Sequence, residues 1–208
     1  MASYGSFTQS EQSLASIEFL QNSPATIGSA FTYYPDNSMF SIAWSIYLSY
    51  LLAAASNVSD SEVSIPPEIG GNLYGQWKFR KYRFTGYAGL DFERFTTFNL
   101  AGVLNDNKIY VDQSRVLYLT AGISKLLNVF GMRLFTKLST SLSILESTVY
   151  DPEGVISNQA YSGAKILWYL NKKIAKKWFM HTLFKYHFMS GPSDLRTLRL
   201  GVGFGYLF

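Results

Sequence analysis

Apolar and polar residues alternate with a period of two along most of this chain. The C-terminal stretch LRLGVGFGYLF is the clearest case, because apolar residues occupy every second position from Leu198 to Phe208, while Arg199, three glycines and Leu207 fill the alternate positions. A period of two places side chains on one face of a β-strand. The same alternation recurs over residues 73–80, 84–93, 117–124, 132–144, 160–170 and 178–189. The pattern predicts an all-β protein.

The segment from Ser38 to Ser59 is the main candidate for a membrane-spanning helix. It carries no charge and is close to the roughly 20 residues that a spanning helix needs. Ser41, Ser45 and Ser49 would also stack on one helix face, as in small-residue helix packing. The apolar residues between Phe40 and Leu52 nevertheless fall at alternate positions, as in the other segments, which favours a strand.

The two faces of these strands differ from those of a soluble β-sandwich. One face is apolar with Trp and Tyr near the strand ends, and the other holds Gly, Ser, Ala and Tyr with isolated charges. A narrow barrel interior takes small residues and buried charges, while a lipid-facing surface is apolar and flanked by aromatic girdles. Runs of 9 to 15 residues also fit the 9–11 that cross a bilayer at a tilt. We therefore predict a transmembrane antiparallel up-and-down β-barrel.

The spacing of the segments predicts the topology of the barrel. Long connections at residues 53–71, 96–114, 145–158 and 190–194 alternate with short turns at 80–83, 125–130 and 171–176. This gives eight strands from Met39 onward. Residues 13–34 add a hairpin with a turn at Asn22–Pro24, so that we favour ten strands over eight in a single domain spanning residues 1–208. Without that hairpin, residues 1–38 would form a periplasmic tail or a plug.

Two segments resemble bacterial outer-membrane β-barrels. Phe208 as the last residue, preceded at alternate positions by Tyr206 and Phe204, resembles the terminal strand that serves as a membrane-assembly signal. Residues 71–95, GNLYGQWKFRKYRFTGYAGLDFERF, resemble the mid-barrel hairpin of small OmpA-like barrels. The resemblance implies an integral location in the bacterial outer membrane. It also implies contact with outer-membrane lipid and lipopolysaccharide, and recognition of the C-terminal strand by the barrel-assembly machinery.

The resemblance further implies an N-terminal export signal, which Met1–Ser3 do not show. We expect a mature form that begins with an added start Met.

Composition narrows the class of protein. Aromatic residues make up 17% of the chain and charged residues 15%, against about 25% charged in soluble domains. Disordered chains are poor in aromatics, so disorder is excluded as the main state. The absence of Cys removes disulfides, thiolate metal sites and a Cys nucleophile. The composition fits a surface that largely faces lipid.

The charges are unevenly distributed. The net charge is +4, yet the first 77 residues contain six acids and no Lys or Arg. The predicted long loops contain most of the acids, namely Asp60, Glu62, Glu68, Asp106, Asp112, Glu146, Asp151, Glu153 and Asp194. The predicted inward positions are mostly basic: Lys78, Arg80, Arg133, Lys137, Lys165, Lys185 and Arg199, against Asp91 and Glu93. We expect an acidic rim and a basic lumen.

Two hypotheses explain the lumen charges. In the first, Lys137, Lys165 and Arg199 pair with Asp91 and Glu93 and fill the interior, since buried charges normally occur in pairs. In the second, unpaired cations, Lys185 among them, retain water, an anion or an acidic plug.

Signs of catalysis are weak. His181 and His187 lie on one predicted strand and face inward, and Ser190 follows His187, so a Ser-His pair with Glu93 is conceivable near the outer rim. The three-residue spacing departs from the lipid A deacylase family, which places His and Ser two apart. No nucleotide, phosphate-loop, zinc-protease or hydrolase motif is present. We predict no cofactor, no metal site and no nucleic-acid binding.

These observations favour a small non-enzymatic outer-membrane barrel with a structural or surface-interaction role through acidic extracellular loops. The alternatives are a narrow passive channel with a basic, anion-favouring lumen, and a lipid-modifying enzyme.

Overall fold

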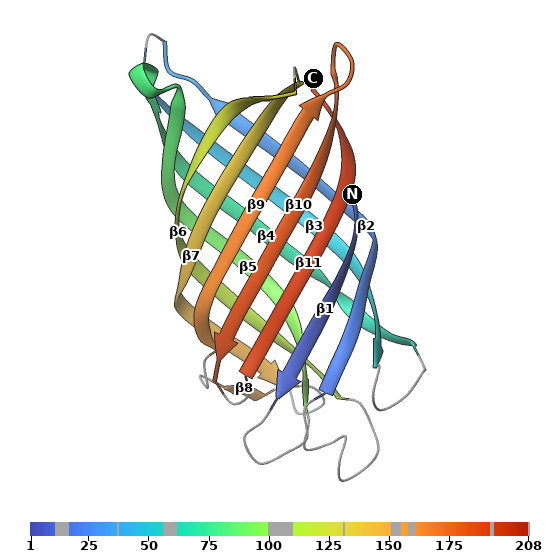
Figure 1. The fold of residues 1–208 in the computed structure, drawn as a ribbon. Helices are drawn as coiled ribbons and strands as arrows, with labels where there is room; N and C mark the ends of the chain where they lie inside the picture. The colour runs from blue at the N-terminus through green and yellow to red at the C-terminus, as the bar shows by residue number, and fades with distance from the viewer. Residues whose placement is uncertain are drawn as a thin grey trace.

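The chain forms a closed β-barrel in the computed structural model (Figure 1). The structure describes residues 1–10, 17–36, 38–55, 62–99, 110–130, 132–150, 155–157, 161–191 and 194–207. No helix in these ranges is long and apolar enough to cross a membrane.

Ten antiparallel strands make up the wall. In chain order the strands are β1 (Ala2–Ser10), β2 (Ile17–Tyr33), β3 (Phe40–Ala55), β4 (Glu62–Phe79), β5 (Phe84–Asn99), β6 (Tyr110–Val129), β7 (Met132–Tyr150), β8 (Val155–Ser157), β9 (Ser162–Lys173), β10 (Trp178–Ser190) and β11 (Asp194–Tyr206). Among the described residues, the short β8 pairs with β7 alone and stands outside the wall. Pairing of β1 with β11 and of β6 with β7 closes the cylinder. The predicted ten-stranded up-and-down barrel is confirmed.

The predicted faces of the strands correspond to the outside and inside of the barrel. On β11, Phe204 is 64% exposed whereas Arg199 is 6% exposed. The same difference separates Ile123 from Tyr118 on β6 and Trp168 from Lys165 on β9. Successive side chains of a strand point to opposite faces, so the alternation sorts apolar residues outward and small or charged residues inward.

The N-terminal hairpin differs from its predicted position. The first strand is Ala2–Ser10, not residues 13–21, and Asn22–Pro24 lies within β2 instead of forming a turn. The register between β2 and β3 shifts between Asn22 and Ala25. Proline cannot donate a ladder hydrogen bond and is tolerated at such a bulge, which explains why Pro24 does not end the strand. Residues 2–10 and 17–33 therefore belong to the wall and do not form a tail or plug.

The strands extend beyond their predicted ends toward the long connections. The loop expected over residues 53–71 shrinks because β4 begins at Glu62. Pro66 and Pro67 do not stop this strand, since the β3–β4 register shifts between Ser49 and Leu51 opposite them. Glu68 is therefore placed in the wall with its side chain buried, and its assignment to an acidic loop is wrong.

The barrel has two distinct ends. The loop end, at the bottom of Figure 1, is where β1, β3, β5, β7 and β10 end and where β2, β4, β6, β9 and β11 begin. The turn end, at the top, contains the short connections 80–83, 130–131 and 174–177. Arg83 and Phe130 adopt left-handed backbone conformations in two of these turns, with φ of 52° and 49°.

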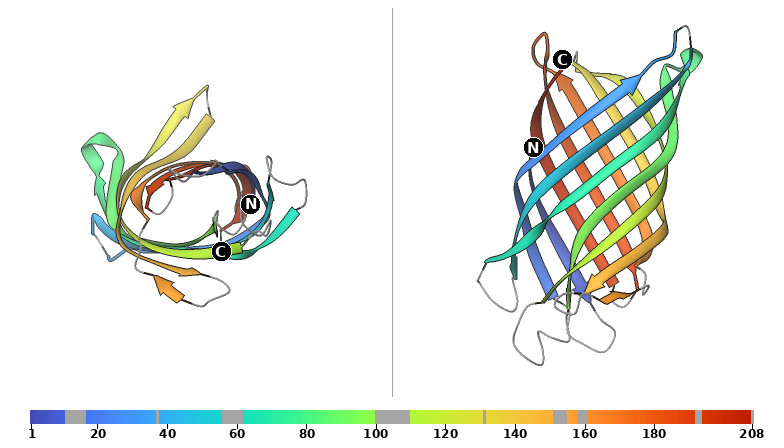
Figure 2. Two further views of the ribbon diagram at one scale, coloured as in Figure 1. Left: turned by 90° about the horizontal axis from the view of Figure 1, so that it is seen from below. Right: turned by 180° about the vertical axis from the view of Figure 1, so that it is seen from behind.

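The wall is less complete near the turn end of β2. β1 pairs with β11 only as far as Ala2 beside Val202, and Met1 exchanges two backbone hydrogen bonds with Thr26. From Ile27 to Tyr33, β3 is the sole strand paired with β2 in the described part of the chain. Figure 2 shows β2 and β11 diverging beyond this point.

Candidate functional site in the barrel interior

A network of buried charged side chains crosses the interior of the barrel. We call it the interior charge network, and its members are Glu68 on β4, Asp91 and Glu93 on β5, Lys165 on β9, Lys185 and His187 on β10, and Arg199 on β11. All are buried. β4 and β5 lie on one side of the wall and β9–β11 on the other, so the contacts span the lumen.

Glu93 is the centre of this network. Its Oε1 lies 2.9 Å from Nζ of Lys165 and 2.8 Å from Nζ of Lys185, and its Oε2 lies 3.1 Å from Nε2 of His187. The hydroxyl of Tyr47, on β3, donates a hydrogen bond of 3.0 Å to the same carboxylate. One carboxylate thus binds side chains of β3, β9 and β10.

Asp91 shares Lys165 with Glu93. The ammonium group of Lys165 donates to Asp91, and the Tyr74 hydroxyl donates a 3.3 Å hydrogen bond to the same Oδ2. Nζ of Lys165 also lies 4.5 Å from the centroid of the Tyr118 ring, within the range of a cation–π contact. Lys165 is therefore held by two carboxylates and an aromatic face.

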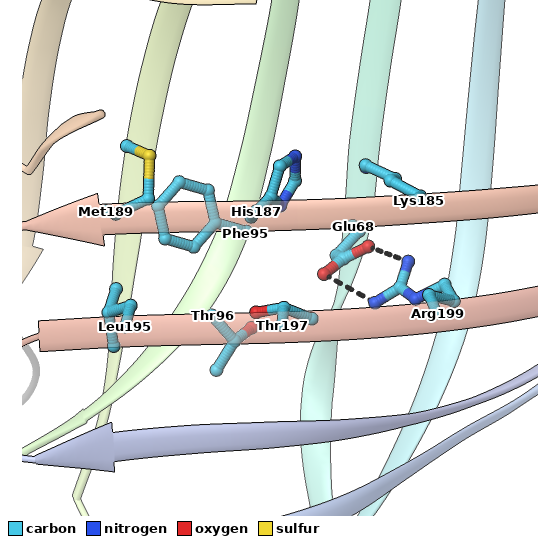
Figure 3. A pocket seen from close by; sticks show the side chains of 9 residues that line it. All are labelled: Glu68, Phe95, Thr96, Lys185, His187, Met189, Leu195, Thr197 and Arg199. Carbon is cyan, nitrogen blue, oxygen red and sulfur yellow. Dashed lines mark hydrogen bonds and ion pairs between the residues drawn. The ribbon is translucent and has the colours of Figure 1, made fainter. Parts of the chain in front are cut away.

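Glu68 and Arg199 form a separate bidentate pair. Nη1 of Arg199 lies 2.6 Å from Oε2 of Glu68, and Nη2 lies 3.1 Å from Oε1 (Figure 3). A planar guanidinium binds a carboxylate in this way through two parallel hydrogen bonds. The pair connects β4 to β11, which are separated along the wall by β3, β2 and β1.

The network is balanced in charge and is not basic. Three carboxylates, on Glu68, Asp91 and Glu93, face the three cationic groups of Lys165, Lys185 and Arg199. The alternating pattern predicts five of these six residues as lumen charges, whereas Glu68 falls in a predicted loop because the two prolines before it resemble a strand terminator. Arg199 consequently pairs with Glu68, and not with Asp91 or Glu93 as expected.

Lys137 lies apart from the ion pairs. Its Nζ is 4.5 Å from the ring centroid of Tyr74 and 4.4 Å from that of Tyr87. No ion pair of Lys137 occurs among the described residues, so the expected partnership with Asp91 or Glu93 does not form. The ammonium group is stabilised by two aromatic faces instead.

Little space remains beside the network. A cavity of about 10 Å³ lies between Glu68, Lys185, His187 and Arg199 on one side and Phe95 and Met189 on the other (Figure 3). Such a volume holds about one water molecule. The side chains that line this cavity are therefore closely packed.

The structure separates the two weak catalytic candidates. His187 is buried beside Glu93, as the sequence allowed, but it does not lie at the rim. Ser190 is exposed at the end of β10, where its hydroxyl donates a 2.8 Å hydrogen bond to Asp194. Side chains three positions apart on a strand point to opposite faces, so His187 and Ser190 do not form a catalytic pair. His181 contacts the rings of Tyr169 and Phe179.

Two residues of the predicted membrane-assembly signal lie on the outside of β11. Phe204 and Tyr206 face outward, and Phe208 lies outside the described residues. Within the described ranges no group of three or more His, Asp or Glu side chains is arranged to hold a metal ion.

A closed barrel with an even number of antiparallel strands, an apolar outer surface and a polar interior defines the class of transmembrane β-barrels. No protein-family model matches the chain, and no curated protein matches it. Similar solved structures are outer-membrane β-barrels. They include the beta domain of the Bordetella autotransporter BrkA, with a TM-score of 0.48 and 6% identity over 100% of this chain and 98% of that one.

An outer membrane channel from Pseudomonas putida F1 has a TM-score of 0.44 and 11% identity over 98% of this chain and 93% of that one. Outer membrane phospholipase A from Escherichia coli has a TM-score of 0.37 and 12% identity over 100% of this chain and 91% of that one. Similarity at these identities concerns the barrel architecture alone.

Proposed function

We propose that the chain is an integral outer-membrane barrel with a sealed interior, which acts without catalysis as a structural or surface-interaction protein through its loop end. The interior charge network carries this proposal, because paired side chains from both sides of the wall occupy the lumen. A sealed barrel leaves the loops as the part that meets other molecules.

The outer surface supports the membrane location. Ile27, Leu142 and Phe204 are each more than 60% exposed, and they belong to a surface in which nearly every outward position is apolar. Soluble monomers rarely expose contiguous apolar patches larger than a few hundred Å². Trp77 and Trp178 lie near the turn end, as residues of an aromatic girdle do. We infer contact with outer-membrane lipid and lipopolysaccharide, and assembly through the C-terminal strand.

The loop end retains an acidic character in this proposal. Glu146 and Asp194 lie near the loop ends of β7 and β11, while Asp60, Asp106, Asp151 and Glu153 fall outside the described residues. Glu62 and Asp112 belong to β4 and β6 near the same end. We infer that the acids near and beyond these strand ends form the surface presented to partners.

Planar-bilayer recording of the purified full chain tests the sealed interior. We expect no stepwise conductance from the wild type. Glu68→Ala/Arg199→Ala removes two large side chains from the lumen without changing the net charge, so this variant should conduct. Asp36→Ala/Lys81→Ala is the matched control, because it removes one acid and one base at the exposed turn end. Stable conductance steps from the wild type would contradict the proposal.

A narrow channel is the second candidate function, and Lys137 is the observation that favours it. Its ammonium group has no carboxylate at ion-pair distance within the described residues, so an opened lumen would favour anions there. If the wild type conducts, a reversal potential in a KCl gradient should show anion preference, and Lys137→Met should reduce it. The channel would then replace the sealed barrel as the function.

A further inference from the structure

The turn end of the barrel carries most of the positive charge of the molecule. Ten of the 18 Lys and Arg residues lie there, namely Lys78, Arg80, Lys81, Arg83, Lys125, Arg133, Lys172, Lys173, Lys176 and Lys177. Asp36 is the one acid at this end among the residues that the structure describes. The turn end therefore has a net charge of +9, and because the whole chain is +4, the remainder has a net charge of −5.

These cations follow one side of the barrel. They flank the β4–β5, β6–β7 and β9–β10 connections, and these six strands are neighbours in the wall. The connection between β2 and β3 carries Asp36 and no base. We call the ten residues the basic arc. Most of them are exposed, and no ion pair of theirs occurs among the described residues.

Aromatic rings accompany the basic arc. Nζ of Lys78 lies 5.3 Å from the ring centroid of Tyr34, and Nζ of Lys81 lies 5.6 Å from that of Tyr82. Nζ of Lys177 lies 5.4 Å from the ring centroid of Tyr206. Tyr and Trp concentrate at the depth of lipid headgroups, and Lys extends its ammonium group to the same depth along an apolar stem.

We propose that the basic arc binds the headgroups of anionic phospholipids in the adjoining leaflet. The inference rests on the membrane location given under the proposed function. The cations are distributed along six neighbouring strands at the rim of the barrel, next to the surrounding lipid, and are not gathered at one strand pair. Their unpaired charge complements phosphate, and the adjacent rings hold them at headgroup depth. Each cation near an anionic membrane surface strengthens binding by a factor of about five.

The chain contains two natural reporters for this interaction. Its four Trp residues are Trp44, Trp77, Trp168 and Trp178, and Trp77 and Trp178 lie on strands of the basic arc close to the turn end. The full-length Trp44→Phe/Trp168→Phe variant retains these two alone. Reconstituted in phosphatidylcholine vesicles with a fraction of phosphatidylglycerol, it permits two quenching series, one with the phosphatidylglycerol brominated and one with the phosphatidylcholine brominated.

We expect brominated phosphatidylglycerol to quench Trp77 and Trp178 more than its mole fraction predicts, and the excess to vanish at 1 M NaCl, where screening is nearly complete. The two quenching series together give the binding constant of phosphatidylglycerol relative to phosphatidylcholine. Lys176→Gln/Lys177→Gln, added to the Trp44→Phe/Trp168→Phe variant, should lower this constant by about fivefold or more. Arg115→Gln/Arg196→Gln, which removes two exposed cations elsewhere, should leave it unchanged.

Equal quenching by the two lipids would overturn the basic arc as a lipid site. An equal fall of the relative binding constant in Arg115→Gln/Arg196→Gln would overturn it as well. Absence of quenching by either lipid would instead refute the membrane location itself. If Lys176→Gln/Lys177→Gln fails to fold, Lys172→Gln/Lys173→Gln takes its place and should lower the same constant. The effect of 1 M NaCl on the Trp44→Phe/Trp168→Phe variant then gives an independent test.

Discussion

At the scale of single residues, the interior is defined by how each buried charge is compensated. Glu93 contacts two ammonium groups, an imidazole and a phenol, and Glu68 contacts one guanidinium. An unpaired charge in such surroundings would cost several kcal/mol, and a complete pair avoids most of that cost. The pairs therefore specify which strands can face each other across the lumen.

Removing one member of the Glu68–Arg199 pair should destabilise the barrel far more than removing both. We expect Arg199→Met and Glu68→Met each to cost about 3–5 kcal/mol, because each leaves a buried charge alone. The double variant should cost less than either single variant, because it leaves no buried charge alone, so the coupling energy should be about 3 kcal/mol or more. Urea unfolding in lipid vesicles, followed by Trp fluorescence, measures all three.

Arg133→Met is the control for that cycle, since Arg133 is exposed at the turn-end mouth. Additive losses from the two single variants would show that the pair contributes no mutual stabilisation.

The sequence predicts the orientation of individual side chains well but predicts their partners poorly. Period two suffices to place Lys165, Lys185 and Arg199 inside, because a strand offers two faces only. Partners depend on which strands meet across the lumen, and that depends on register and closure. Glu68 shows the difference, because Pro66 and Pro67 make its segment resemble a loop in the sequence, although its carboxylate lies in the wall and pairs with Arg199.

At the scale of strands, close packing between neighbours fixes where the interior side chains reach. Gly70 on β4 lies against the ring of Tyr47 on β3, and a Cβ atom at Gly70 would come within 2.3 Å of the Tyr47 ring. The ring occupies the space that any other residue type would need. Its hydroxyl thereby reaches Glu93.

Gly70→Ala should displace the Tyr47 ring and weaken its hydrogen bond to Glu93. We expect a loss of about 1–3 kcal/mol, the range for overpacking a filled interior. Gly86→Ala is the matched control, because its added Cβ would meet the end of the Phe79 ring at 3.3 Å, where a small shift of the ring is enough. Heat-modifiable migration on gels and urea unfolding provide the measurements. Equal stability of the two variants would refute this role for Gly70.

The strand that closes the barrel is β1, whereas the sequence predicts residues 13–21 in this place. Because the chain has no Cys, a pair of introduced cysteines can test this closure without competing thiols. Ser6 and Leu198 are paired across β1 and β11. Directly opposed residues are close enough for a disulfide. Ser6→Cys/Leu198→Cys should therefore form one on oxidation, shifting the gel mobility of the unfolded chain.

Ser6→Cys/Phe204→Cys is the control, because Phe204 lies six residues farther along β11, about 20 Å away. Cross-linking of the control with equal yield, or failure of the opposed pair, would contradict the register. The sequence could not settle this register, since residues 2–10 and 13–21 both offer a short run that can pair and periodicity alone does not choose between them.

At the scale of the whole molecule, charge separates along the barrel axis. The turn end is basic, the central network is neutral, and the predicted loops carry much of the acidic excess. The strand count and the outward apolar surface followed from the sequence, because both derive from local periodicity and spacing. The prediction of a basic lumen is wrong. Several bases on inward positions, such as Lys78 and Arg133, lie at the exposed mouth and belong to the basic arc.

The interior charge network has a kinetic consequence. Its carboxylates all come from β4 and β5 and its cations from β9, β10 and β11, so its contacts join residues 72, 74 and 131 positions apart. Contacts between such distant parts of a chain form late, because the loop between them must close first. Until the cylinder closes, six charges lack their partners and oppose exposure of the inner face to lipid. A half-assembled barrel is thus penalised in the membrane, and insertion is driven toward a concerted final step.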